Sequence, residues 1–122
     1  MTDKPRDVSA LLPLKSRYLE IMLSVADGSR HGYGIMQDVR SRSQGRVRLW
    51  PAALYGSLRE LQDLGLIGET AARPSKDEDD ERRRYYRLTT RGRRVLEAEI
   101  HRLEDLVKAA RGAGVVARPK KA

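Results

Sequence analysis

The spacing of the apolar residues changes twice along this chain, and the order of these changes limits the folds open to it. The spacing is first that of amphipathic helices, then that of short strands, and finally helical again. The helical segments are 15–26, 35–42 and 51–64, the strand segments are 67–71 and 84–88, and the last helical segment is 90–111. We therefore expect three helices, a two-stranded hairpin and one further helix.

That order is typical of the winged helix-turn-helix, so the expected fold class is mainly α (α+β) with a two-stranded β-wing and a C-terminal dimerisation helix. In this fold the third helix can enter the major groove of DNA while the wing lies along the backbone. The expected parts of the chain are a flexible N-terminal arm at 1–10, the winged helix-turn-helix at 11–89, the dimerisation helix at 90–111 and a disordered basic tail at 112–122.

The charge of the chain favours a polyanionic partner. The 122 residues include 25 Lys and Arg against 17 Asp and Glu, which gives a formal net charge of +8. Such an excess attracts nucleic acid first and an anionic membrane surface second. No apolar run approaches the ~20 residues that span a bilayer, and residues 1–7 lack the pattern of a signal peptide. We expect a cytoplasmic protein without membrane contact.

The residue types argue against catalysis. The chain has no cysteine and only two histidines, which excludes disulfides, thiolate zinc sites and cysteine nucleophiles. The sequence also offers no pairing of a nucleophile with a base, no glycine loop that could cradle phosphates and no triad of metal ligands. We therefore expect no enzymatic activity, no cofactor and no metal site.

Three stretches, in this order, resemble the PadR family of transcriptional regulators over residues 9–111. Residues 26–35 are similar to the family's turn into its second helix. Residues 51–67 resemble the recognition helix and its exit into the wing, and residues 83–92 resemble the returning wing strand and the start of the last helix. Because a single helix follows the wing, the chain is similar to the short branch of the family.

The resemblance implies a regulator, in the role of a repressor, that binds a pseudo-palindromic operator in double-stranded DNA as a homodimer. It also implies a small-molecule effector, whose identity stays open. The alternative is a winged helix used for protein–protein or RNA contacts, because net charge alone does not separate these partners from DNA.

Seven side chains are candidate DNA contacts. On the third helix, Arg59 either clamps a guanine through its forked donors or belongs to a solvated helix face, and Ser57 can bind a phosphate or a base. Tyr55 is either a phosphate contact or mainly a core residue. Tyr33 lies at the positive end of the second helix, where phosphates bind readily. The remaining candidates, which follow the DNA backbone, enter a narrow minor groove or form a solvated face, are Arg82, Arg83 and Arg84.

Five consecutive acids at 77–81 lie beside these wing arginines in the sequence. DNA phosphates would repel the acids. We expect the tip of the wing either to point away from DNA or to compete with DNA for the arginines.

Two positions depart from the pattern of the family. Ala52 and Ala53 stand where the family usually has Gly-Thr, so a hydroxyl that could touch a phosphate or a base is absent. Trp50 stands where a helix-capping residue belongs, and indole offers no acceptor to the free N–H groups. We expect Trp50 to be a packing residue at the base of the recognition helix.

Apolar surface in excess of one small core predicts a homodimer. The seam on the last helix and the second apolar face of the first helix have no evident cover within one chain. The alternative is a monomer whose last helix folds back on its own domain. The residues expected at the dimer interface are Leu12, Leu14, Tyr18, Met22, Leu96, Ile100, Leu103 and Val107.

Overall fold

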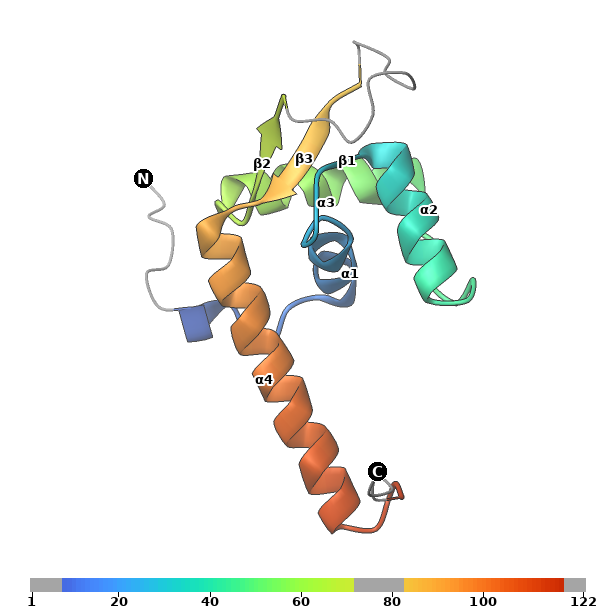
Figure 1. The fold of residues 1–122 in the computed structure, drawn as a ribbon, viewed down its shortest axis with the longest axis vertical. Coiled ribbons are helices and arrows are strands. Elements are labelled where there is room, and N and C mark those ends of the chain that lie inside the picture. Colours follow the sequence, from blue (N-terminus) through green and yellow to red (C-terminus); the bar gives the residue numbers. More distant parts are fainter. Residues whose placement is uncertain (1–7, 72–82, 118–122) are drawn as a thin grey trace.

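A computed structural model of the chain describes residues 8–71 and 83–117. The predicted order of three helices, a strand hairpin and a last helix is confirmed, and so is the mixed α+β class. None of the helices in the described ranges combines the length and apolar character needed to cross a bilayer. The elements are η1 (Val8–Leu11), α1 (Ser16–Ser24), β1 (Arg30–His31), α2 (Gly32–Arg42), α3 (Pro51–Asp63), β2 (Ile67–Thr70), β3 (Tyr85–Leu88) and α4 (Thr90–Gly112) (Figure 1).

The sheet has one strand more than the sequence predicts. β3 pairs antiparallel with β2, with Ile67 opposite Leu88, and its other edge pairs antiparallel with β1, with Arg30 opposite Tyr86. β1 has only two residues, too few to show the alternation by which a strand is recognised in a sequence. The added strand ties the start of α2 to the wing.

Helix α1 lies at the centre of the domain and contacts α2, α3 and α4 (Figure 1). Its central residues Ile21 and Met22 are fully buried, and Val25 directly after the helix is also in the core. A helix that is covered on three sides uses both of its apolar faces within its own chain.

Half of the residues predicted at the dimer interface therefore lie elsewhere. Leu14, Tyr18, Met22 and Leu96 are buried in the core of a single chain. For Tyr18 and Met22 the prediction was wrong because it treated the second face of α1 as uncovered, whereas α2, α3 and α4 together cover it. Leu14 before α1 and Leu96 on α4 pack into the same core.

The turn after α3 is joined to the start of α4 by hydrogen bonds and by a close backbone approach. The Thr89 hydroxyl donates to the carbonyl of Gly65 at 2.7 Å and accepts from the N–H of Gly92 at 2.9 Å, which caps α4. The N–H of Thr89 donates to the carbonyl of Leu66 at 3.1 Å. A Cβ atom at Gly92 would lie 1.9 Å from that same carbonyl oxygen, so only glycine fits there. These contacts hold α3 and α4 as one unit.

A buried carboxylate ties the segment before α1 to α4. Glu99 is buried, and its Oε2 accepts from the backbone N–H of Leu14 at 2.6 Å, while its Oε1 accepts from the guanidinium of Arg102. The hydrogen bond from Arg102 lowers the pKa of Glu99 more than burial raises it, and the N–H of Leu14 adds to the lowering. The buried charge is therefore compensated on both oxygens.

We predict that Gly92→Ala lowers the free energy of unfolding by about 3 kcal/mol, because the new methyl group must displace the backbone of Leu66. Urea denaturation measures this. The matched control is Gly56→Ala, since a Cβ atom there meets nothing within 4 Å and alanine favours a helix by up to ~1 kcal/mol. Equal stability of the two variants would contradict the close approach of α4 to Leu66.

We predict that Glu99→Gln costs about 2 kcal/mol of unfolding free energy at neutral pH, since a charged buried hydrogen bond is lost. The folded pKa of Glu99 is lowered, so its charge stabilises the fold above the unfolded value of 4.5, and this contribution disappears as the pH falls through the folded pKa. The difference between wild type and variant should therefore shrink in acid. The control is Glu97→Gln at an exposed position of the same helix. If the stability difference between wild type and Glu99→Gln does not change with pH, the stabilisation by Glu99 is not electrostatic.

Candidate nucleic-acid interface

Helix α3 has one side in the core and one side in solvent. Pro51 occupies its first turn, where the fixed φ of proline suits the helix and the missing N–H costs nothing. Leu54 and Leu58 are buried, as the sequence predicts. Tyr55 and Arg59 are exposed, and because they are four residues apart they lie on the same side of the helix. This side is free to meet a partner.

Ser57 does not belong to the exposed side. It is only 2% exposed, and its hydroxyl accepts a hydrogen bond from Nε of Arg17 at 3.0 Å. Its position three residues after Leu54 and four before Leu61 places it on the buried stripe. The expectation that Ser57 faces a phosphate or a base is therefore corrected: it joins α3 to α1.

Tyr55 reaches across to the start of α2. Its hydroxyl lies 2.7 Å from the place that a Cβ atom of Gly32 would take, so the ring packs directly over this glycine. The side chain nevertheless remains half exposed. Of the two readings of Tyr55, the one that makes it mainly a core residue is excluded.

His31 joins the start of α2 to the wing. Its Nδ1 accepts from the backbone N–H of Gly34 at 3.0 Å and so caps α2, while its Nε2 lies 3.0 Å from a guanidinium nitrogen of Arg83. Its ring meets the ring of Tyr85 edge to face, with 5.3 Å between the ring centres. The sequence pattern predicts no role for His31 and so misses this cap and both wing contacts.

A groove of about 410 Å³ lies between the start of α2, the exposed side of α3 and the wing. Among the described residues its lining has hydroxyl, imidazole and guanidinium groups and no carboxylate; the nearby Glu69 pairs with Arg84 at 3.5 Å. Burial raises the pKa of Tyr86, and the charge of Glu69 adds to this, so its hydroxyl stays neutral. The lining residues are His31, Gly32, Tyr33, Tyr55, Arg83, Arg84 and Tyr86.

Four of the seven predicted contacts therefore meet in one place, because Tyr33, Tyr55, Arg83 and Arg84 all line this groove. Arg59 lies one helical turn beyond Tyr55 on the exposed side of α3, and within the described ranges it has no ion pair. Arg82 and the acidic run at 77–81 fall outside the described residues. The assembled surface offers neutral and cationic donors, which suits phosphate groups.

Trp50 is exposed rather than packed at the base of the helix. Its side chain is 69% exposed, and no side chain caps the start of α3. The residue before a proline adopts extended backbone, here with φ −75° and ψ 153°, so Trp50 does not continue the buried stripe of the helix. The dipeptide Trp50–Pro51 is the signal in the sequence that could have predicted this exposure.

The sequence model of the transcriptional regulator PadR-like family matches residues 21–98. The chain belongs to the PadR-like family of transcriptional regulators. The match runs from the last residues of α1 through α2, α3 and the wing strands to the first turns of α4, so it includes every described residue that lines the groove. Membership in this family agrees with the expectation that the chain is not an enzyme.

Solved structures of transcription regulators share the fold. A PadR family regulator from Clostridium difficile superposes with a TM-score of 0.66 at 20% identity, covering 80% of this chain and 97% of that one. A Streptococcus transcriptional regulator superposes with a TM-score of 0.64 at 22% identity, and the match covers 80% of this chain and 90% of that one. A PadR-like transcription factor from Bacteroides fragilis has a TM-score of 0.60 at 22% identity, and the match covers 80% of this chain and 87% of that one.

A relative of higher identity is known only as an uncharacterized 37.1 kDa protein in a transposon of Streptomyces fradiae. The two are 36% identical over 86 residues, which cover 70% of this chain. The matched segment spans only 22% of the length of that relative.

Proposed function

We propose that this PadR-like chain binds double-stranded DNA in a sequence-specific way through the exposed side of α3. The observation that carries the proposal is the convergence of Tyr33, Tyr55, Arg83 and Arg84 on one groove beside Arg59, a groove with no acidic residue among its described lining. A duplex whose major groove receives α3 would bring its phosphates to the start of α2 and to the wing, where these donors lie.

The residues divide into two roles. The groove residues bind phosphates, and their cations release counterions, so they contribute affinity that depends on salt and little on sequence. Arg59 reads a base edge, because a guanidinium can donate two parallel hydrogen bonds to guanine. Sequence preference therefore depends on Arg59 and affinity on the groove.

We predict that Arg59→Ala weakens binding of the preferred duplex by about 10- to 100-fold, the equivalent of 1–3 kcal/mol, and relaxes the preference at one base pair. Fluorescence anisotropy with a duplex selected from a random library measures both effects. Arg94→Ala removes an equal charge from an exposed position on α4 and should change little. The proposal fails if Arg59→Ala behaves like Arg94→Ala, or if the wild type prefers RNA of the same sequence.

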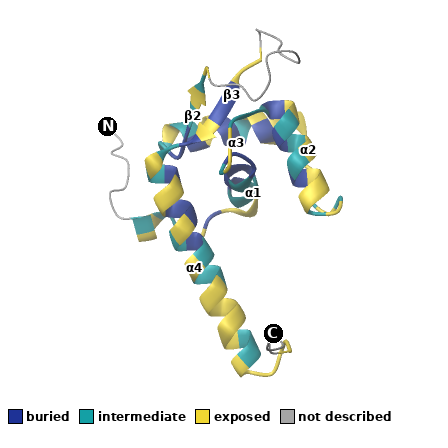
Figure 2. Ribbon diagram, viewed as in Figure 1, coloured by how far each residue is buried: buried dark blue, intermediate teal, exposed yellow. Residues whose placement is uncertain are grey.

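We also propose that the chain acts as a homodimer through the second half of α4. This half extends away from the domain and is largely exposed (Figures 1 and 2). Leu106 and Val107 are 55% and 43% exposed, and Ile100 and Leu103 are partly buried. Of the residues predicted at the interface, Leu12, Ile100, Leu103 and Val107 remain candidates.

The charges around this apolar strip suit a second copy of the same helix. A shallow groove of about 600 Å³ on α4 has Ile100, Leu103 and Val107 at its base. Along the helix two carboxylates are followed by two cations, so two antiparallel copies can place opposite charges together across a two-fold axis. The rim residues are Glu104, Asp105, Lys108 and Arg111.

A dimer of this kind would bind a pseudo-palindromic operator, because each half-site then meets one α3. We propose that it represses transcription, since a dimer that covers promoter DNA excludes other proteins from it, and that it works in the cytoplasm, where that DNA lies. A small-molecule effector remains a proposal that rests on the resemblance alone.

We predict that Val107→Glu converts the dimer into a monomer with unchanged helix content, because it places two carboxylates in the apolar strip at the two-fold axis. Sedimentation equilibrium gives the oligomeric state and circular dichroism gives the helix content. Ala109→Glu adds the same charge on the opposite side of α4 and should stay dimeric. A wild type that is monomeric at micromolar concentration would contradict the proposal directly.

A further inference from the structure

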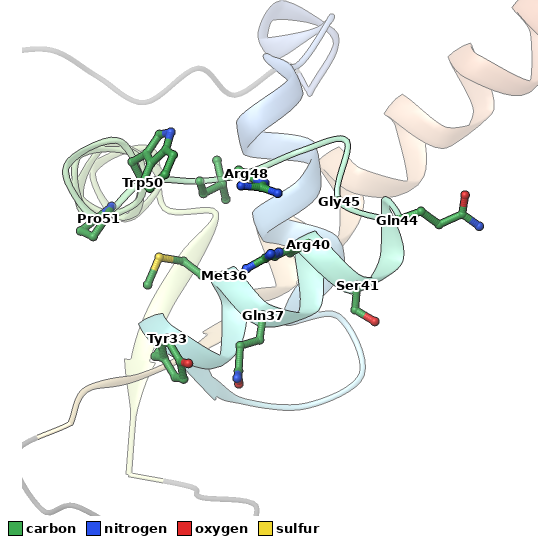
Figure 3. Close-up of a pocket in the computed structure, with 11 residues that line it drawn as sticks. Tyr33, Met36, Gln37, Arg40, Ser41, Gln44, Gly45, Arg48, Trp50 and Pro51 are labelled. Atoms are coloured by element: carbon green, nitrogen blue, oxygen red, sulfur yellow. The ribbon is translucent and has the colours of Figure 1, made fainter.

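A second groove lies on the other side of Tyr33, between α2 and the start of α3. It has a volume of about 670 Å³ and lies next to the groove described above, because Tyr33 lines both. Figure 3 shows Trp50 and Pro51 at the start of α3 across from Met36 and Tyr33 on α2. The site therefore continues the surface that we assign to DNA.

The walls of this second groove carry aromatic surface that the fold leaves uncovered. Trp50 is more exposed than any tyrosine of the chain. Tyr33 and Tyr55, the half-exposed tyrosines, lie on the same surface, whereas Tyr18, Tyr85 and Tyr86 are buried. Exposed aromatic side chains that gather in one region are typical of a binding surface.

The charge of this region is positive. Residues 39–59 contain five arginines and no acidic residue. Arg42 is used within the fold, since it pairs with Glu20 at 2.7 Å and with Asp38 at 2.5 Å. Arg40 and Arg48, by contrast, line the second groove and have no ion pair within the described ranges (Figure 3). An occupant must therefore combine a negative charge with an apolar surface.

We propose that this second groove binds the sugar–phosphate backbone of the duplex that α3 reads. The indole of Trp50 packs on a deoxyribose, and Arg40 and Arg48 bind the phosphates on either side. The sugar offers an apolar surface to the indole, and the phosphates offer negative charge to the two guanidinium groups. The inference rests on the proposed DNA binding and extends it to a backbone contact through Trp50, Arg40 and Arg48 that reads no base edge.

Trp50 is the only tryptophan, so its fluorescence reports on this groove alone. The probe is the duplex selected from a random library, and labelled-duplex anisotropy follows binding in the same samples. With excitation that avoids tyrosine, we expect Trp50 emission to be quenched in step with binding. Neutral acrylamide should then quench the remaining emission less than it does in the free protein.

Three variants separate the parts of the contact. Trp50→Ala should weaken binding about tenfold with an unchanged salt dependence, because it removes packing and no charge. Arg40→Ala and Arg48→Ala should each lower the slope of log affinity against log salt by about 0.9, the value for one phosphate contact. Arg94→Ala on α4 is the control for charge, and thermal unfolding confirms that each variant is folded.

The outcomes distinguish this inference from the proposed function. If the duplex binds tightly while Trp50 emission, acrylamide access and the affinity of Trp50→Ala stay unchanged, the second groove does not contact DNA but the function of α3 stands. If benzoate shifts the Trp50 emission and the duplex does not, the groove is a small-molecule site and the inference is overturned. If the wild type binds no duplex, both are overturned.

Discussion

The contact between the backbone of Leu66 and the first turn of α4 sets the geometry of the whole domain. Thr89 caps α4 and bonds to the turn after α3, and Gly92 allows the two backbones to meet at van der Waals distance. Because of this junction, the helix that we assign to DNA and the helix that we assign to dimerisation move as one unit. The separation of two α3 helices in a dimer would then follow from how two α4 helices pack.

The arginines divide by whether the fold uses their charge. Arg42 and Arg102 bind carboxylates of their own chain, and Arg17 donates to Ser57. Arg40, Arg48 and Arg59 lie around the exposed start and side of α3 without ion pairs in the described part of the chain. An unpaired cation on a folded surface is available to a polyanion, and counterion release makes such contacts favourable. The excess of basic residues therefore indicates a binding surface only after the arginines that form ion pairs within the fold are left out.

Much of the fold could be predicted from local pattern, since the helical stripes and the wing strands repeat at fixed intervals. The bounds of the third and the last helix and the exposed Arg59 belong to this part. Features that depend on partners distant in the sequence could not be predicted: the second face of α1 is covered by three helices, and β1 is a strand only because β3 lies beside it. Ser57 was misplaced although its spacing from Leu54 and Leu61 puts it on the buried stripe.

Glu99 and Trp50 are opposite cases, a charge inside and an indole outside. Glu99 lies three residues after the buried Leu96 and so on the same side of α4, but only the structure identifies Leu14 and Arg102 as the groups that compensate its charge. Trp50 precedes a proline and so leaves the helix pattern. Both residues break a local rule: the buried charge is compensated within the fold, and the exposed indole is available to a partner.

The central claim is that two α3 helices are presented to one face of a duplex by the joined α3–α4 units of a dimer. Hydroxyl-radical footprinting of the preferred duplex tests it most directly. The account predicts two protected patches of equal extent on the same face, about one helical turn or ~34 Å apart and related by a two-fold axis. A single patch, or two patches on opposite faces of the duplex, would contradict it.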